Sequence, residues 1–196
     1  MQKLSREFYL GDTVDIARAL VGCTLVSVTE EGITSGRIVE TEAYLGTEDT
    51  AAHASKGDPN GRTRVLFGEG GYAYVYLIYG MYNCLNFATG PEGKPECVLI
   101  RALEPMEGLD IMAKRRKTDK LSALCSGPGK LCMALDITMA DYGADLCGER
   151  LYVLPRKDTP EIIATPRINI DYAPEHRDKP WRFVDKNSRL LSIKLK

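Results

Sequence analysis

The segment RIVETEAY, residues 37–44, carries two carboxylates and an aromatic ring at alternate positions. Side chains two residues apart in a strand point to the same face at intervals of about 6.6 to 6.8 Å. We therefore expect Ile38, Glu40, Glu42 and Tyr44 to share one face of a strand. Burying two carboxylates has a high cost in free energy. A carboxylate beside an aromatic wall is suited to act as a general base.

Other polar residues allow simpler hypotheses. The two glutamates could be solvated, or paired with arginines such as Arg37 or Arg101, as most acidic residues of strands are. For Arg101, within LIRALEP, a salt bridge is the default hypothesis. His53 lies in a polar loop a few residues beyond the carboxylates, where a surface role is the usual one. Asn86 interrupts an apolar strand and needs a hydrogen-bond partner if it is buried.

Residues 72–86, YAYVYLIYGMYNCLN, contain five of the ten tyrosines of the chain. Their period-two alternation predicts a strand buried on both sides, and a second strand follows, so the segment reads as a hairpin. The turn falls at Tyr79 and Gly80, whereas tight hairpin turns favour Asn-Gly or Asp-Gly. A large aromatic ring held at an exposed turn is suited to act as a probe, a wedge or a lid.

Composition limits the class of protein. A chain of 196 residues with 44% hydrophobic content fits one globular domain, residues 1–196. No apolar run suits a membrane span or a signal peptide, so we expect a cytoplasmic protein. The six cysteines form no CxxC pair and are expected to be reduced core residues. Two histidines in unlike contexts argue against a transition-metal site. No cofactor is expected.

Charge argues against bulk coating of nucleic acid, because the formal net charge is only −1. Basic residues nevertheless cluster locally. Arg62 and Arg64 lie in GRTR, Lys130 stands alone, and KRRK occupies residues 114–117. For residues 114–117 a solvated helix face is the leading hypothesis, and phosphate contact is the minority one.

The elements expected to position these residues are strands with irregularly placed helices. A helix capped by Asp12 precedes two strands joined at residues 30–32. A polar loop over about 46–70 leads to the tyrosine hairpin. A further strand and an amphipathic helix follow, and then a second helix with Ser126 as its cap and Pro128 in its first turn. The regular rhythm of a parallel sheet is missing, which favours the α+β class.

Four segments, in this order and spacing, resemble the alkyladenine (3-methyladenine) DNA glycosylase family, the vertebrate-type alkylpurine glycosylases with bacterial relatives. They are RIVETEAYLGTEDTAAHASKG, YVYLIYGMYNCLN, CVLIRALEPMEGL and LCSGPGKLCMAL. The resemblance covers nearly the whole chain and is densest over about residues 6–136. It implies a mixed domain with a curved antiparallel sheet, peripheral helices and a protruding β-hairpin that enters the minor groove of DNA.

The resemblance also implies roles for single residues. Tyr79 matches the tyrosine at the hairpin tip, which fills the gap left by a flipped nucleotide, with Met81 intercalating beside it. Stacking of about 1–3 kcal/mol offsets part of the cost of extruding the base. Glu42 matches the general base that activates water for attack on the sugar C1′, and the counterpart of Arg101 holds the water or the carboxylate. The implied base pocket consists of Tyr44, His53, Tyr76 and Asn86.

The implied function is a base-excision-repair glycosylase that acts on double-stranded DNA with a damaged purine. Its substrates would come from 3-methyladenine, 7-methylguanine, hypoxanthine and etheno-adenine, without a choice among them. Cationic purines would gain about 0.5–2 kcal/mol from the aromatic pocket. The enzyme would be monofunctional and, if bacterial, associated with the nucleoid; we expect a monomer. Asn86 would exclude the exocyclic amine of guanine by steric hindrance. The resemblance does not define the role of residues 168–170 in the pocket wall.

Three basic residues are the candidates for contacts to the DNA backbone: Arg62, Arg64 and Lys130. Two alternatives stay open on the residues alone. One is a nucleoside or small N-glycoside hydrolase, which needs the same carboxylate and stacking but has no use for an exposed Tyr79. The other is a non-catalytic nucleic-acid-binding module, for which Glu42 would be dispensable.

Overall fold

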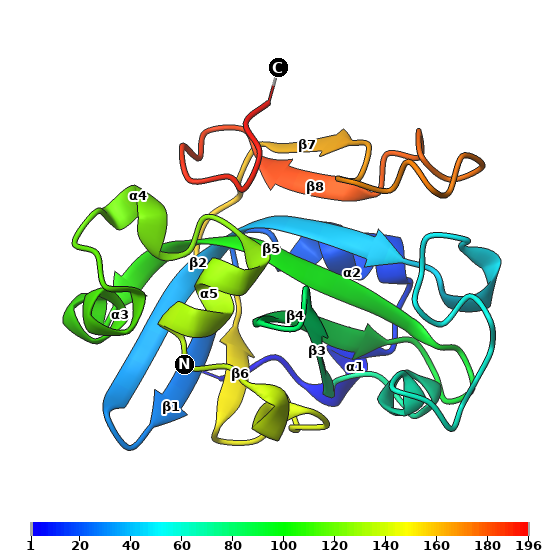
Figure 1. Ribbon diagram of the computed structural model, residues 1–196, viewed down its shortest axis with the longest axis horizontal. Helices are drawn as coiled ribbons and strands as arrows, with labels where there is room; N and C mark the ends of the chain where they lie inside the picture. The colour runs from blue at the N-terminus through cyan, green and yellow to red at the C-terminus, as the bar shows by residue number, and fades with distance from the viewer. Residues whose placement is uncertain (1, 196) are drawn as a thin grey trace.

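A curled antiparallel sheet forms the centre of the computed structural model, which describes residues 2–195 (Figure 1). The strands are β1 (Thr24–Thr29), β2 (Gly32–Tyr44), β3 (Ala73–Ile78), β4 (Tyr82–Thr89), β5 (Glu96–Glu107), β6 (Leu151–Leu154), β7 (Ile162–Thr165) and β8 (Arg182–Asp185). Their order is β3-β4-β5-β2-β1-β6, and β8 pairs with both β2 and β7. This arrangement confirms the α+β class and the antiparallel sheet.

Strand β2 changes its neighbour along one edge. It pairs with β1 as far as Arg37 and with β8 from Glu40 onward, while β5 runs along the other edge. The register with β5 shifts between Ile38 and Glu40, which leaves Val39 as an extra residue. Such a bulge bends the strand and redirects the side chains that follow.

The bulge makes one expectation wrong. Ile38 belongs to the main hydrophobic core with Ala43, whereas Val39 packs in a separate cluster with Val184. Ile38 therefore does not share a face with Glu40, because the extra residue reverses the alternation between them.

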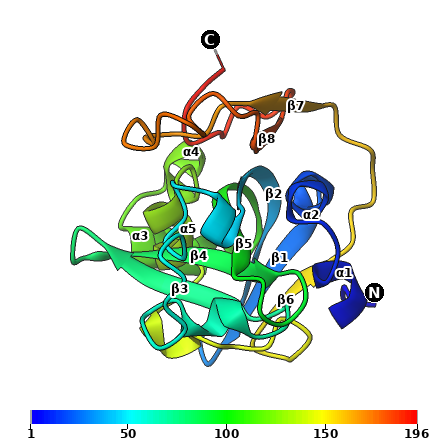
Figure 2. The same ribbon diagram turned by 90° about the vertical axis from the view of Figure 1, so that its right-hand side faces the viewer.

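The helices surround the sheet. They are α1 (Arg6–Tyr9), α2 (Thr13–Leu20), α3 (Leu109–Arg116), α4 (Leu121–Leu124) and α5 (Pro128–Ala134), with short 3-10 helices η1 (Gly46–Glu48), η2 (Arg64–Phe67) and η3 (Met139–Asp141). Figures 1 and 2 show α3 to α5 grouped together and apart from α2. Buried residues of α2, α3 and α5 all belong to the main hydrophobic core. Asp12 caps α2 by accepting the backbone N–H groups of Val14 and Asp15, as predicted.

The start of α5 agrees with the sequence only in part. Pro128 occupies the first turn, as expected. The N-cap is Gly127, and the Ser126 hydroxyl donates to the carbonyl oxygen of Ser122 at 2.7 Å. Ser126 as a cap was therefore wrong, because the preceding turn of α4 takes its hydroxyl.

The cysteines are free thiols in the described chain, and all but Cys147 are buried. Three of them, Cys23, Cys125 and Cys132, lie in the main core beside residues such as Leu25 and Leu131. Burial raises the pKa of Cys125 to about 12, so this thiol stays protonated. In residues 2–195, no helix is long and apolar enough to cross a membrane.

Strands β3 and β4 form a hairpin that projects from the body of the protein (Figure 2). Its base is buried from Ala73 to Val75, but its outer half is exposed, so burial on both sides was wrong beyond the base. Tyr79 has φ of 55° and Gly80 has φ of 69°, the positive values of a tight hairpin turn. Tyr79 is 83% exposed and Met81 is 65% exposed. The prediction of an exposed aromatic tip is confirmed.

Candidate active site

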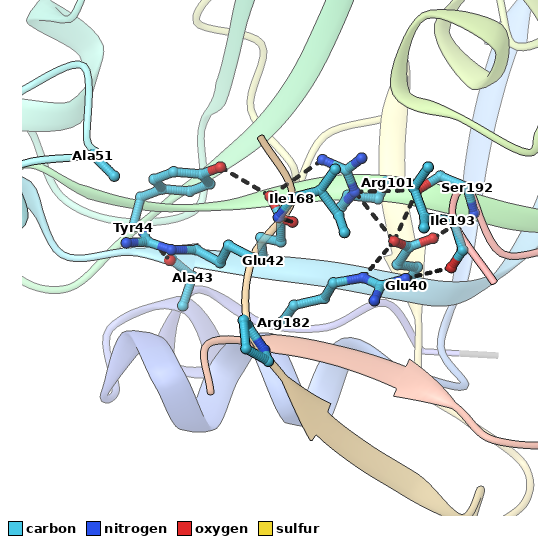
Figure 3. A network of polar contacts seen from close by, with 12 residues as sticks. Glu40, Glu42, Ala43, Tyr44, Ala51, Arg101, Ile168, Arg182, Ser192 and Ile193 are labelled. Carbon is cyan, nitrogen blue, oxygen red and sulfur yellow. Dashed lines mark hydrogen bonds and ion pairs between the residues drawn. The ribbon is translucent and has the colours of Figure 1, made fainter. Parts of the chain in front are cut away.

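Glu42 is completely buried at the middle of the sheet and accepts three hydrogen bonds (Figure 3). Its Oε1 accepts the backbone N–H of Ile168 at 2.7 Å. Its Oε2 accepts the hydroxyl of Tyr44 at 2.8 Å and Nη1 of Arg101 at 3.2 Å. A carboxylate oxygen has about two acceptor positions, so Oε1 keeps the capacity for one more donor such as a water.

Glu40 lies on the same strand and is just as buried, but its partners differ. Its Oε1 accepts from Nε of Arg101 at 3.1 Å, Nε of Arg182 at 2.7 Å and the hydroxyl of Ser192 at 2.8 Å. Its Oε2 accepts the Ser192 N–H at 2.6 Å. Four donors surround this carboxylate, so Glu40 fits the structural hypothesis of pairing with arginines.

Arg101 bridges the two carboxylates, with Nε on Glu40 and Nη1 on Glu42 (Figure 3). Burial opposes its charge, but the two neighbouring carboxylates outweigh burial, so the pKa of Arg101 is raised above its ordinary value. The salt-bridge hypothesis for Arg101 is confirmed. Arg37 was the wrong partner for the glutamates, because it binds Asp185 at 2.6 Å.

A cavity of about 720 Å³ opens in front of these residues. Glu42 does not line it, but all three of its partners do, so the carboxylate sits directly behind the wall. This size falls within the range of about 300–1,000 Å³ typical of small-molecule sites. The residues that line it include Tyr44, His53, Arg62, Tyr76, Tyr79, Arg101, Lys130 and Ile168.

Aromatic rings form the inner part of the cavity. The rings of His53 and Tyr76 meet edge to face with centroids 4.5 Å apart. Tyr44, His53 and Tyr76 also line a smaller inner cavity of about 60 Å³, and Asn86 lies there. The structure therefore brings together the four residues that the resemblance assigned to the pocket. Asn86 is 2% exposed, and its amide donates to the carbonyl oxygen of Tyr74 at 3.1 Å.

The pocket keeps its titratable rings neutral. Desolvation, followed by the positive charge of Arg62, lowers the pKa of His53 to about 4. His53 as a whole is partly exposed to solvent, and this lowered pKa makes its imidazole neutral at neutral pH. Its Nδ1 lies 3.0 Å from the Tyr74 hydroxyl. Burial and then the Glu42 carboxylate raise the pKa of Tyr44, so its hydroxyl stays a donor.

The basic candidates lie around the cavity. Arg62 and Lys130 line it. Arg64 lines an adjacent cavity, where its guanidinium lies 5.8 Å from the ring centroid of Tyr142. At these positions the three side chains could contact the phosphates of a nucleic acid that runs along the rim of the cavity.

The basic run at 114–117 mostly has structural partners. Lys114 and Arg115 both pair with Glu31, at 3.0 and 2.8 Å. Arg116 donates to the carbonyl oxygens of Ala123 and Leu124. These bonds support the structural hypothesis for the run over phosphate contact.

Sequence reasoning missed several residues that hold the site. Ser192 and Arg182 surround Glu40, and a buried pair of Arg167 with Asp49 lies behind Tyr44. The available signal was weak: arginines and an aspartate in segments without a motif. Across residues 2–195, no three His, Cys, Asp or Glu side chains converge to hold a metal ion.

Comparison with known proteins identifies the family of the chain. A family model described as methylpurine-DNA glycosylase matches residues 7–189. A Methanocella arvoryzae protein named "Putative 3-methyladenine DNA glycosylase" is 53% identical over 194 residues, which cover 98% of this chain and 96% of that protein. A Clostridium novyi protein of the same name is 45% identical over 202 residues, with 99% and 100% covered.

Proposed function

The chain belongs to the methylpurine-DNA glycosylase family, a family of DNA N-glycosylases, and we propose that Glu42 is the base that activates water in its reaction. One observation carries the proposal. A fully buried carboxylate lies behind a cavity whose wall consists of its own hydrogen-bond partners and of aromatic rings.

The contacts of Glu42 suit a general base for hydrolysis of an N-glycosidic bond. Arg101 and Tyr44 donate to Oε2, and Ile168 holds Oε1, so the carboxylate has one orientation. A water bound to the remaining position of Oε1 would lose a proton to Glu42 as its oxygen attacks C1′. The purine leaves with the electrons of the glycosidic bond. A reaction in which water is the nucleophile needs no covalent bond between an amine of the enzyme and C1′, so it would be monofunctional.

The pocket suits a flipped purine, which would enter between Tyr44 and the pair of His53 and Tyr76. Neutral His53 adds no repulsion toward a cationic base such as 3-methyladenine or 7-methylguanine. Electron-rich rings attract such a base by about 0.5–2 kcal/mol. Hypoxanthine and etheno-adenine are neutral and would stack on the rings without this cation–π attraction. Asn86 at the inner end would contact the edge of the base and exclude the guanine amine.

The hairpin suits insertion into duplex DNA. Tyr79 projects at its tip and also lines the cavity, so the wedge and the pocket are adjacent. Met81 would enter the groove beside it. Arg62, Arg64 and Lys130 would then contact phosphates on the rim, which orients the duplex without reading sequence.

Family membership decides between the three hypotheses drawn from the residues. A small N-glycoside hydrolase needs no exposed Tyr79, and a binding module needs no buried Glu42. The family is one of glycosylases that act on DNA, which argues against both.

Single-turnover release of the base from duplex DNA tests the proposal. Substrates would carry hypoxanthine, etheno-adenine or methylated purines, with the wild type and Glu42→Gln compared. We expect release by the wild type and a loss of about 10²–10⁴-fold in the variant, the usual contribution of a general base. A Glu42→Gln enzyme as fast as the wild type would contradict the assignment. Borohydride trapping of an enzyme–DNA adduct would contradict a monofunctional reaction.

A further inference from the structure

A buried ion pair lies behind the pocket wall without lining the main cavity. The side chains of Arg167 and Asp49 are both fully buried. Nη1 of Arg167 lies 2.5 Å from Oδ2, and Nη2 lies 2.9 Å from Oδ1. Burial opposes the ionisation of both groups, but their mutual attraction outweighs it, so the pKa of Asp49 is lowered and the pKa of Arg167 is raised.

The pair joins three segments of the chain that form the site. Nη1 of Arg167 also donates to the carbonyl oxygen of Ala43, the residue between Glu42 and Tyr44 on β2. Asp49 opens the loop that leads to the pocket histidine. Arg167 is followed directly by Ile168, whose N–H holds the Glu42 carboxylate. The Arg167 guanidinium therefore fixes the position of Glu42 relative to the Ile168 N–H and to the loop that carries His53.

The guanidinium also supports the pocket wall. Its Cζ lies over two rings, 4.6 Å from the centroid of Tyr44 and 5.0 Å from that of Trp181. Tyr44 lines the main cavity and Arg167 does not, so the guanidinium packs against the face of Tyr44 that is turned from the cavity. A ring held by a planar cation on one face and by its hydroxyl on Glu42 has little freedom to rotate.

Stability alone is a poor reason for this arrangement. Replacing a buried ion pair with apolar residues of similar volume is often neutral or stabilising. The Nε of Arg167 is moreover buried with no hydrogen-bond partner, which has a cost. We infer that Arg167 and Asp49 are positioning residues that hold the Ile168 N–H on Glu42 and the Tyr44 ring against the flipped base. This inference rests on the proposed function of Glu42.

The test compares two pairs in which the same replacements are made. Arg167→Met with Asp49→Leu removes the positioning pair. Arg37→Met with Asp185→Leu removes a control pair that also joins β2 to a C-terminal segment, at 2.6 Å, and that neither touches Glu42 nor lines the main cavity. Single-turnover base release per folded enzyme and affinity for DNA with an abasic-site analogue are measured for each.

We expect the positioning variant to release base about 10- to 100-fold more slowly, the effect of a misplaced hydrogen bond to a charged group. Its affinity for abasic DNA should stay within about twofold, because the hairpin and rim are unchanged. The control pair should leave the rate per folded enzyme unchanged. Equal rates in the two double variants would overturn the inference.

A lysine variant decides the question if the double variant does not fold. Arg167→Lys keeps a positive charge beside Asp49. It loses the second hydrogen bond to Asp49, the stacking of a planar group on Tyr44 and the hydrogen bond to the carbonyl oxygen of Ala43. We expect Arg167→Lys to slow base release about 10-fold or more, while Arg37→Lys releases base at close to the wild-type rate. A rate within about twofold of wild type for Arg167→Lys would refute the positioning role. Glu42→Gln in the same assay keeps the tests separate, because a fully active Glu42→Gln would refute the proposed function instead.

Discussion

Replacing Glu40 with glutamine should mainly destabilise the protein. Its carboxylate is buried and accepts from two guanidiniums and from Ser192. Glu40 is the only carboxylate within ion-pair distance of Arg182 in the described chain, and the Arg182 side chain is 4% exposed. Breaking one partner of a buried pair costs about 3–5 kcal/mol. At about 2–4 °C per kcal/mol for a protein of this size, Tm should fall by roughly 6–20 °C.

Replacing Glu42 with glutamine should mainly reduce the rate of base release and have a smaller effect on stability. Its guanidinium partner Arg101 keeps Glu40 as a counter-ion, so the loss is closer to one hydrogen bond to a charged group, about 1.5–3 kcal/mol. The rate of base release should fall by about 10²–10⁴-fold, because an amide cannot take a proton from water.

The assay pairs two measurements on the same preparations. Urea or thermal unfolding gives the change in stability, and single-turnover release at a temperature where both variants are folded gives the rate. Glu40→Gln should keep most of its rate per folded enzyme. Glu42→Gln should keep most of its stability and its affinity for damaged DNA.

Two results would refute this reasoning. Loss of activity in Glu40→Gln with an active Glu42→Gln would assign the base to Glu40. Equal destabilisation and equal inactivation of the two variants would show that Arg101 couples the carboxylates into one unit.

Three further predictions concern binding and protonation. Tyr79→Ala should weaken capture of damaged duplex by about 5- to 150-fold, the loss of about 1–3 kcal/mol of stacking, while Tyr79→Phe retains it; equal binding by all three proteins would contradict the wedge. Tm should not change, since the ring is 83% exposed. Lys130→Ala should reduce the slope of log Kobs against log salt concentration by about 0.9, and an unchanged slope would remove Lys130 from the interface. His53 should titrate by NMR with a pKa of about 4, and a midpoint near the ordinary value would contradict its packing. Because the folded state binds this proton less tightly than the unfolded state, protonation of His53 should lower stability as pH falls below about 6.5.

Local patterns predicted much of the fold. Alternation located β2 and the hairpin, and Asp12 located the start of α2. The turn at Tyr79 and Gly80 could be predicted because a tight turn with positive φ depends on residues that are adjacent in the sequence. The prediction of one continuous face on β2 was wrong at Ile38, because a bulge depends on how neighbouring strands pair.

The candidate site was predicted as a set of residues but not as an arrangement. The resemblance supplied Glu42, Arg101 and the pocket rings without saying what holds them. Nothing in the order of residues distinguished the donors of Glu40 from those of Glu42, because both lie on one strand and share Arg101.

The sequence by itself determined which chemistry was available: two carboxylates two residues apart on a strand, and a tyrosine at a hairpin tip. Only the tertiary structure decided the surroundings of these side chains. Glu42 receives its backbone donor from a residue 126 positions later, and Glu40 receives Ser192 from 152 positions later. Contacts over such separations depend on how the C-terminal segment closes over the sheet. The burial and hydrogen bonds on which the proposed roles of the two carboxylates rest exist only after that closure.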